Sequence, residues 1–189
     1  YWTIIRTYYD LANRPVGVVQ DLVINSTPAN SEAEVLTAIN TPLAGVPSYN
    51  ASHPDWNIQT NTVYDDAGNV LETRDPQGIL TRSSYDQANR LTLTIQNFVG
   101  TGVYNPANPD QNVRAEYFYD LNNNLIATKD TLGMITRTYY DELNRPKTVV
   151  QNLTGQTISV TTPPGRGTDA NIRTDTYYDA NGNVIATMD

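Results

Sequence analysis

The 189-residue sequence has no cysteine and only one histidine, His53. Without cysteine there is no disulfide framework, no thiolate nucleophile and no thiolate metal site, so packing and hydrogen bonding must supply the stability. His53 has no second histidine with which to share a metal ion or a proton, and serine and proline flank it. We interpret it as a solvated loop residue, and we expect no metal site, no cofactor and no catalytic residue.

Positive charge is also scarce: 12 Lys and Arg stand against 20 Asp and Glu, which gives a formal net charge of −8 and a pI near 4.5. A nucleic-acid site needs clustered cations that displace counterions, so this balance argues against nucleic acid as a partner. No apolar run reaches the length of about 18 residues that a membrane helix needs, and no basic-then-apolar segment begins the chain. We expect a soluble chain without a signal peptide, taken from a longer parent protein.

The residues that are abundant point to β-structure. Thr, Val, Ile and Tyr favour strands, and Asn, Asp, Gly and Pro occur between them as turn residues. The composition therefore predicts an all-β fold, either as one domain or as two small modules.

A repeat organises the chain, and residues 116–146 hold its fullest copy. Two Tyr-Asp pairs begin 21 positions apart in that copy, with a D-x-x-G turn between them. The spacing recurs in 63–90, and the first pairs of successive units are 55 and 59 positions apart. Long repeats predict a stack in which each unit buries its apolar face on its neighbours. The repeated positions are Tyr9, Asp10, Tyr64, Asp65, Gly68, Asp75, Gly78, Tyr85, Asp86, Tyr119, Asp120, Asp130, Gly133, Tyr140, Asp141, Tyr178, Asp179 and Gly182.

The copies divide the chain, which we treat as a single array over residues 1–189, into repeat units and insertions. The units cover about 1–20, 60–96, 114–152 and 172–189, and the insertions about 21–59, 97–113 and 153–171. We expect antiparallel hairpins stacked into a continuous twisted or spiral sheet. Each insertion ends with Asp, any residue and Asn, at 55–57, 110–112 and 169–171. This shared exit predicts that the insertions leave and rejoin the sheet at equivalent points.

The first insertion also carries a helix signal. Ser31 and Glu34 have the spacing of a capping box, aliphatic residues follow at helical spacing, and Pro42 marks an end. We predict a short helix from 31 to about 40, with a coil as the alternative.

The pattern Y-D-x-x-G-N, a D-x-x-G turn and then Y-D-x-x-N-R resembles the YD repeats, also called Rhs repeats. These occur in bacterial Rhs proteins, in the cocoon components of insecticidal toxin complexes and in animal teneurins. The resemblance implies a long antiparallel sheet that winds into a hollow shell, which in several members encloses a C-terminal toxin. The insertions are longer than ordinary hairpin loops of about 2 to 5 residues. We expect them to decorate one rim of the sheet.

The recurring tyrosines and aspartates have a functional and a structural interpretation. The rings could line a sugar-binding face, but a ladder of packed rings with wet hydroxyl groups explains them more simply. The aspartates stand at turn mouths, where a carboxylate accepts backbone N–H groups, whereas catalysis would need a partner at a defined separation in a cleft. A residue repeated six times along a stack is a poor candidate for one active site.

Two further patterns stay structural. Residues 120–124 and 179–183 match the opening of an EF-hand calcium loop but lack its glycine at the sixth position, and Asn-rich turns explain the same letters. Arg14, Arg90 and Arg145 each follow an Asn. We expect them to bridge to neighbouring acids or carbonyl groups, with a small effect on stability.

These observations predict a non-catalytic structural segment of a shell or scaffold in a larger secreted or cell-surface protein of the polymorphic-toxin type. Its partners would be the rest of the parent array, an enclosed C-terminal toxin and, through unpaired sheet edges, a second copy of the chain. The alternative is an adhesion module that binds a glycan or a cell-surface protein through its insertions. Exposed Trp56 and Tyr104 would then make the contacts.

Overall fold

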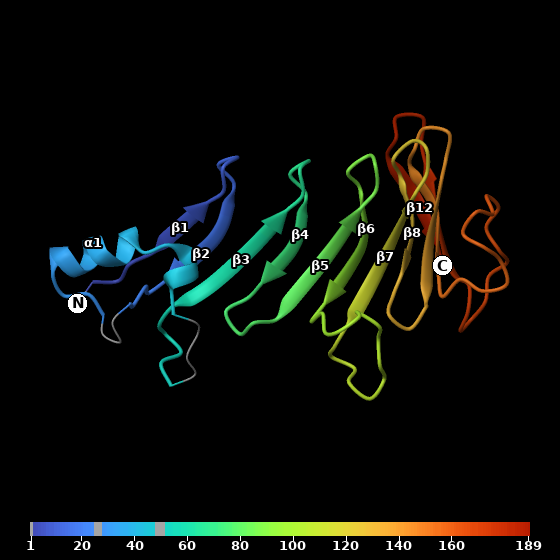
Figure 1. Ribbon diagram of the computed structural model, residues 1–189. Coiled ribbons are helices and arrows are strands. Elements are labelled where there is room, and N and C mark those ends of the chain that lie inside the picture. Colours follow the sequence, from blue (N-terminus) through green and yellow to red (C-terminus); the bar gives the residue numbers. More distant parts are fainter. Residues whose placement is uncertain (1, 25–27, 48–51) are drawn as a thin grey trace. The chain divides into compact units, whose positions relative to one another are not determined.

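The computed structural model describes residues 2–24, 28–47 and 52–189. Twelve antiparallel strands form one open sheet, and their order in the sheet follows the chain from β1 to β12 (Figure 1). The all-β prediction is confirmed. Within the described residues, no helix has the length and apolar character needed to cross a membrane.

Every strand is short, between 4 and 7 residues. Their bounds are β1 (Arg6–Tyr9), β2 (Pro15–Gln20), β3 (Ile58–Tyr64), β4 (Val70–Arg74), β5 (Leu80–Tyr85), β6 (Leu91–Gln96), β7 (Val113–Tyr119), β8 (Leu125–Lys129), β9 (Ile135–Tyr140), β10 (Pro146–Gln151), β11 (Ile172–Tyr178) and β12 (Val184–Met188). Between β2 and β3 lie the helix α1 (Glu32–Asn40) and the 3-10 turn η1 (Leu43–Gly45).

The chain divides into two compact units. The first comprises residues 1–84, 95–103 and 110–112, and the second comprises 85–94, 104–109 and 113–189. The first unit therefore holds β1 to β4 and most of β5, and the second holds β7 to β12.

The Tyr-Asp hairpins share one turn geometry. The strand register shifts beside the turn, for example between Tyr8 and Tyr9 and between Val63 and Tyr64. The fourth turn residue then takes a positive φ, which glycine adopts freely and Asn tolerates better than other residues. These residues are Asn13, Gly68, Asn89, Asn123, Asn144 and Gly182.

In the first unit, the first insertion folds onto β1 and β2 and forms a hydrophobic core with them (Figure 1). The predicted helix is confirmed as α1, because the Ser31 side chain accepts the N–H of Glu34 at its start. Buried Leu22 and Ala38 from the insertion pack with Ile4, which precedes β1, and with Val19 of β2. The insertion thus covers a face of these strands.

In the second unit, the third insertion folds onto β9 and β10. Leu153 is buried against Tyr139 and Val150. Gln156 donates a hydrogen bond of 2.7 Å to the Tyr139 hydroxyl. The expectation that the insertions decorate a rim is therefore wrong for the first and third, because the strand residues beneath them are apolar and need cover.

Candidate functional site

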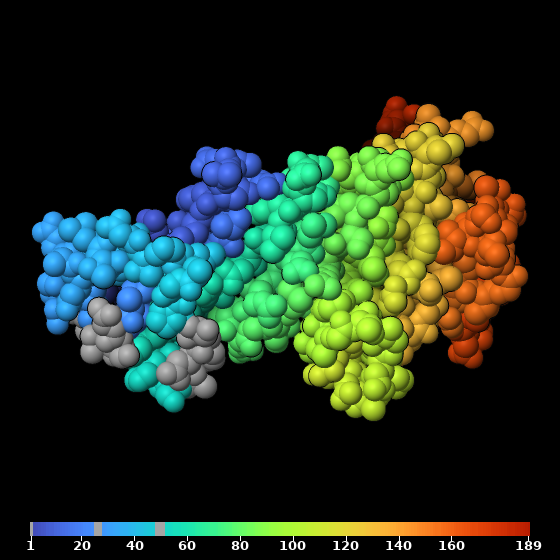
Figure 2. All heavy atoms as spheres, viewed as in Figure 1, coloured from blue at the N-terminus to red at the C-terminus, as the bar shows by residue number. Residues whose placement is uncertain are grey.

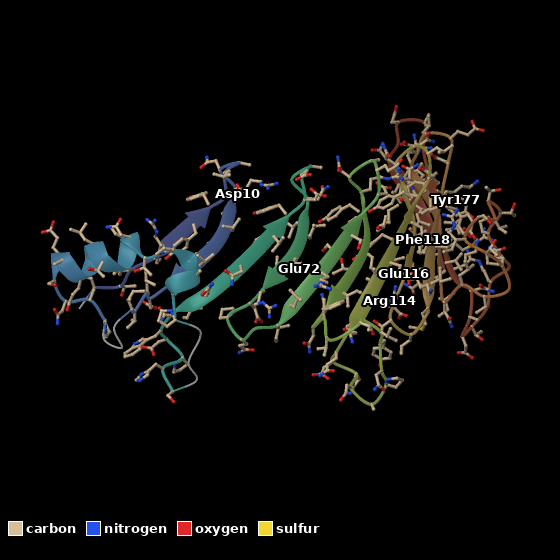
Figure 3. The ribbon with its side chains drawn as sticks, viewed as in Figure 1. Asp10, Glu72, Arg114, Glu116, Phe118 and Tyr177 are labelled. Atoms are coloured by element: carbon tan, nitrogen blue, oxygen red, sulfur yellow. The ribbon has the colours of Figure 1, made fainter. Side chains whose placement is uncertain are left out.

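The turn edge of each hairpin is organised by the aspartate of its Tyr-Asp pair. In the β1–β2 turn, which projects from the edge of the first unit (dark blue, Figure 2), the Asp10 carboxylate accepts the backbone N–H groups of Ala12 and Arg14 at 2.9 Å. Figure 3 labels Asp10 at this turn. The same pattern recurs at Asp86, Asp120, Asp141 and Asp179. Asp65 accepts the N–H of Asn69 at 2.7 Å.

The fifth turn residue completes the aspartate's hydrogen bonds with its side chain, and its identity alternates along the chain. It is Arg in the β1–β2, β5–β6 and β9–β10 turns and Asn in the other three. The Nε atoms of Arg14, Arg90 and Arg145 each lie 2.7 Å from their own aspartate. The Nδ2 atoms of Asn69, Asn124 and Asn183 make the same contact at 2.8 to 2.9 Å.

The arginines also reach the next hairpin of their own unit. Arg14 donates to the carbonyl of Asp65 at 2.7 Å, and its guanidinium lies over the Tyr64 ring, 4.8 Å from the centroid. Arg90 likewise donates to the Asp120 carbonyl and covers Tyr119. Arg145 lies 4.4 Å from the Tyr178 centroid. The expected bridges to neighbouring acids or carbonyl groups are confirmed at all three arginines, since each pairs with an aspartate and Arg14 and Arg90 also bond a carbonyl. Each of the three arginines joins two turns.

The tyrosines of the Tyr-Asp pairs therefore contact arginine and backbone. The Tyr64 hydroxyl donates to the Pro15 carbonyl, the Tyr178 hydroxyl to Pro146 and the Tyr140 hydroxyl to Leu125. For Tyr64, Tyr119 and Tyr178 the ring partner is a guanidinium, in place of the ring-on-ring ladder that we expected. Tyr85 is half-buried at the end of β5, and Tyr9 is 58% exposed.

These contacts stabilise the ionised form of the turn aspartates. The pKa of Asp10 lies below its ordinary value, first because the Arg14 N–H donates to the carboxylate and then because its guanidinium does. Asp86 and Asp141 have lowered pKa values for the same leading reason, with Arg90 and Arg145 as donors. The carboxylates are thus engaged within their own turns and are not poised as general acids.

The D-x-x-G turns at the opposite ends of the strands are simpler. Asp75 accepts the N–H of Ile79, and Asp130 accepts those of Leu132 and Met134. Gly78 and Gly133 both have φ near 87°.

The insertions begin and end at equivalent hydrogen-bonded points, which we call the insertion mouths. In each mouth, the N–H of the last Asn donates to the carbonyl of a residue at the start of the insertion or directly before it: Asn57 to Asp21, Asn112 to Asn97 and Asn171 to Asn152, at 2.9 to 3.0 Å. All six of these residues have a positive φ, between 47° and 54°. The prediction that the insertions leave and rejoin the sheet at equivalent points is confirmed.

The two aromatic loop residues expected to be exposed are only partly exposed. Trp56 and Tyr104 are both half-buried. His53 is exposed, as expected, and stacks on Trp56 with ring centroids 3.9 Å apart. Within residues 2–24, 28–47 and 52–189, no group of three or more His, Asp or Glu residues is placed to hold a metal ion.

Comparison with known families matches residues 64–101 to the family described as RHS Repeat. This stretch is therefore similar to an RHS repeat. The resemblance carried by the Tyr-Asp pattern is thereby confirmed for this stretch, which runs from the end of β3 past β6.

Two solved structures align with nearly the whole chain at low identity. The crystal structure of TcdB2-TccC3-Cdc42 aligns with 95% of this chain and 9% of its own, at 16% identity and a TM-score of 0.40. The Photorhabdus luminescens Tc holotoxin pore with a mutated TccC3 aligns with 94% of this chain and 8% of its own, at 16% identity and a TM-score of 0.39. This chain spans less than a tenth of those chains. A comparison with curated proteins finds no match.

Two features of the turn edge and the insertion mouths were not predicted from the sequence. The Arg and Asn alternation is visible in the sequence as D-x-x-x-R against D-x-x-x-N, but its role depends on the next turn in space. The mouth asparagines were noted as a shared exit. Their side chains also tie down the insertion: Asn57 donates to and accepts from the backbone of Val23, at 2.9 and 2.8 Å.

Proposed function

We propose that the chain is a non-catalytic RHS-repeat segment with an architectural role. It would form part of the β-sheet wall of a larger secreted or surface-associated protein of the toxin-complex type. The observation that carries this proposal is the arginine bridge, which joins consecutive turns at three places through one geometry. An array built in this way gains stability by adding hairpins, since each new hairpin buries surface on the last.

The hydrogen bonds of the turn aspartates support a role without catalysis. A pair of carboxylates that acts as general acid and base needs environments that push the two pKa values apart. The turn aspartates Asp10, Asp65, Asp86, Asp120, Asp141 and Asp179 instead all have lowered pKa values, and each accepts hydrogen bonds from its own turn. A repeated environment of this kind suits a scaffold.

Deleting residues 58–112 tests the stacking. The deletion joins Asn57 to Val113, which reproduces the natural Asn112–Val113 junction and removes one period of the repeat. The shortened chain should fold with a lower free energy of unfolding and a smaller dependence on urea, because less surface is buried. Deleting only 100–109 leaves every strand in place and serves as the control. If the two deletions had equal effects on the unfolding curve, the stacked-array proposal would fail.

Replacing the bridging arginines tests the edge directly. Arg14→Lys and Arg145→Lys keep the charge but lose the planar group that binds an aspartate and covers a ring together. We expect each to cost about 1 kcal/mol of unfolding free energy, the usual range for cation–π contacts and exposed ion pairs. Arg74→Lys is the matched control, because Arg74 bonds the carbonyl of Gly78 in its own turn. An equal loss in all three variants would contradict a bridging role.

The partners follow from the same proposal. They are the remaining repeats of a parent protein and a toxin polypeptide enclosed by the completed wall. The last strand, β12, is exposed at all five residues and pairs with β11 alone among the described strands. We infer that this edge accepts a further strand, from the parent or from a second copy. Light scattering that shows a strictly monomeric chain at high concentration would argue against pairing between copies.

A further inference from the structure

A small pocket lies at the mouth of the first insertion. Its volume is about 130 Å³, and its walls include Trp2, Trp56, Asp21, Asp55, Leu22 and Pro28. The chain contains only two tryptophans, so both of them line this one pocket. The scaffold role proposed above does not require such a concentration of aromatic surface.

The two aspartates of the pocket differ from the turn aspartates. Their carboxylates accept no hydrogen bond and form no ion pair with any of the described residues, whereas each turn aspartate accepts at least two hydrogen bonds. No Lys or Arg is among the residues that line the pocket. Two aspartates without a cationic partner among the lining residues therefore border the pocket together with two tryptophans.

The Trp56 ring is held in position from outside the pocket. His53 stacks on it nearly parallel, with 7° between the ring planes, and His53 is not a wall of the pocket. Trp2 is 52% exposed, so its ring is accessible to a ligand. Indole is the aromatic group that attracts cations best, through the negative face of its π-system.

We propose that this pocket binds a small alkylammonium group, such as the head group of choline or the end of a lysine side chain. The carboxylates supply the opposite charge and the indoles the apolar, cation-attracting walls. The volume fits this class, since pockets for larger organic ligands start at roughly 300 Å³.

The mouth of the third insertion provides an internal comparison. The pocket there is also lined by two aspartates, Asp130 and Asp169, but its apolar walls are Met134 and Ile172. Carboxylates beside aliphatic side chains offer no cation–π attraction, so this second mouth should not retain an alkylammonium ligand. The proposed site is therefore a property of the first insertion, not of the repeat.

Tryptophan fluorescence tests the proposal, because both fluorophores line the pocket. Choline chloride, tetramethylammonium chloride and N-acetyl-lysine methylamide are titrated at constant ionic strength, against sodium chloride. The neutral analogue 3,3-dimethylbutan-1-ol has the shape of choline without its charge. We expect a saturable change with the ammonium ligands and at least tenfold weaker binding of the alcohol. The two ammonium types separate a choline-like ligand from a lysine side chain.

Charge-removing variants localise the effect. Asp21→Asn installs the residue that the other two mouths carry at this position, so the fold accommodates it. Combined with Asp55→Asn, it should weaken choline binding about tenfold, and Trp56→Leu should weaken it by about 2- to 30-fold. Asp110→Asn, the equivalent of Asp55 at the second mouth, should bind choline as the wild type does.

Three results would overturn the proposal: no saturable response, equal binding of choline and the alcohol, or unchanged binding in the double variant. Saturable binding of a neutral sugar would instead assign the pocket to a glycan. Urea unfolding of the same variants reports on the sheet separately. The ligand site and the scaffold role can therefore fail independently.

Discussion

The first and third insertions occupy equivalent places in the repeat and cover the sheet by different means. Leu22 and Leu153 both follow the mouth residue, and their N–H groups donate to the carbonyls of Ile4, just before β1, and of Ile135, at the start of β9. Beyond that point the first insertion covers β2 with α1 and η1, and the third covers β10 with loop segments and charged side chains. The mouth therefore fixes where an insertion starts, while the structure of the insertion beyond the mouth can vary.

The same sheet position shows the difference most clearly. Gly17 on β2 lies under Leu43, and the corresponding Thr148 on β10 donates its hydroxyl to Asp175 at 2.6 Å. Asp175 also pairs with Arg173 and with Arg166 from the third insertion. Its side chain is 8% exposed, so the third insertion is fastened by a nearly buried charge cluster. Such a cluster fixes geometry at a high cost in desolvation.

Truncating the leucine at each mouth should show the largest effect and the sharpest contrast. Leu22 and Leu153 are 2% and 6% exposed, and Leu22 belongs to the larger cluster. We expect Leu22→Ala to lower the free energy of unfolding by about 3 to 5 kcal/mol and Leu153→Ala by about 2 to 3 kcal/mol. Urea unfolding followed by circular dichroism measures both.

Tryptophan fluorescence adds a control for the first of these variants, because Trp2 and Trp56 contact the first insertion mouth. Leu22→Ala should shift the emission of the folded protein, and Leu153→Ala should leave it unchanged. A greater loss of stability in Leu153→Ala would reverse the comparison and make the third insertion the better-packed one.

Removing the charge of Asp175 should have the next largest effect. Asp175→Asn leaves Arg166 and Arg173 without their carboxylate, and we expect a loss of about 1 to 3 kcal/mol, the range for hydrogen bonds to charged groups. The matched variant is Asp169→Asn, an exposed aspartate in the same insertion. Urea unfolding in low and high salt checks the result. Equal stability of the two variants would mean that packing alone holds the third insertion.

The sequence predicted the repeating part of the fold well because its signals are local. Gly68 indicates a positive φ in its turn, the Asp-x-Asn triplets indicate a shared exit of the insertions, and Ser31 with Glu34 indicates the start of α1. The packing of the first and third insertions on the sheet was not predicted, because it depends on contacts between residues distant in the sequence. The residues around Gly17 in the sequence do not indicate that Leu43 packs on it. Arg166 reaches Asp175 only after the third insertion has folded back onto the sheet. Trp56 looked exposed in its loop for the same reason.

Low pH should weaken the charge cluster around Asp175 that holds the third insertion on the sheet. Burial alone would raise the pKa of Asp175, but hydrogen bonds from Thr148 and Arg173 and the charges of both arginines outweigh it and lower the pKa. A lowered pKa contributes stability above the unfolded value of about 4, and this contribution is lost as pH falls through the folded value. The stability difference between wild type and Asp175→Asn should therefore be constant from neutral pH down to about 4 and shrink below it.

The comparison of wild type with Asp175→Asn removes the contributions of the other acidic residues to the pH dependence of stability. The turn aspartates have lowered pKa values too, but they are the same in both proteins, so their loss in acid does not enter the difference. Urea unfolding at a series of pH values provides the measurement. A difference that stays constant into the acid range would show that the charge of Asp175 does not hold the third insertion.

Gly17→Ala should have the smallest effect on the free energy of unfolding. It changes only the packing of the first insertion on β2. A Cβ at this position would lie 2.7 Å from a terminal carbon of Leu43, so that side chain must rotate or η1 must move. Overpacking of this kind costs about 1 to 3 kcal/mol, and the strand gains about 0.5 to 1 kcal/mol when alanine replaces glycine. We expect a net loss of about 1 kcal/mol in urea unfolding. In the double variant Gly17→Ala with Leu43→Ala, the packing of Leu43 is lost, but the clash with the new Cβ is lost too. The loss of unfolding free energy should therefore be smaller than the sum of the two single losses. Strict additivity would show that α1 and η1 do not rest on β2 through this contact.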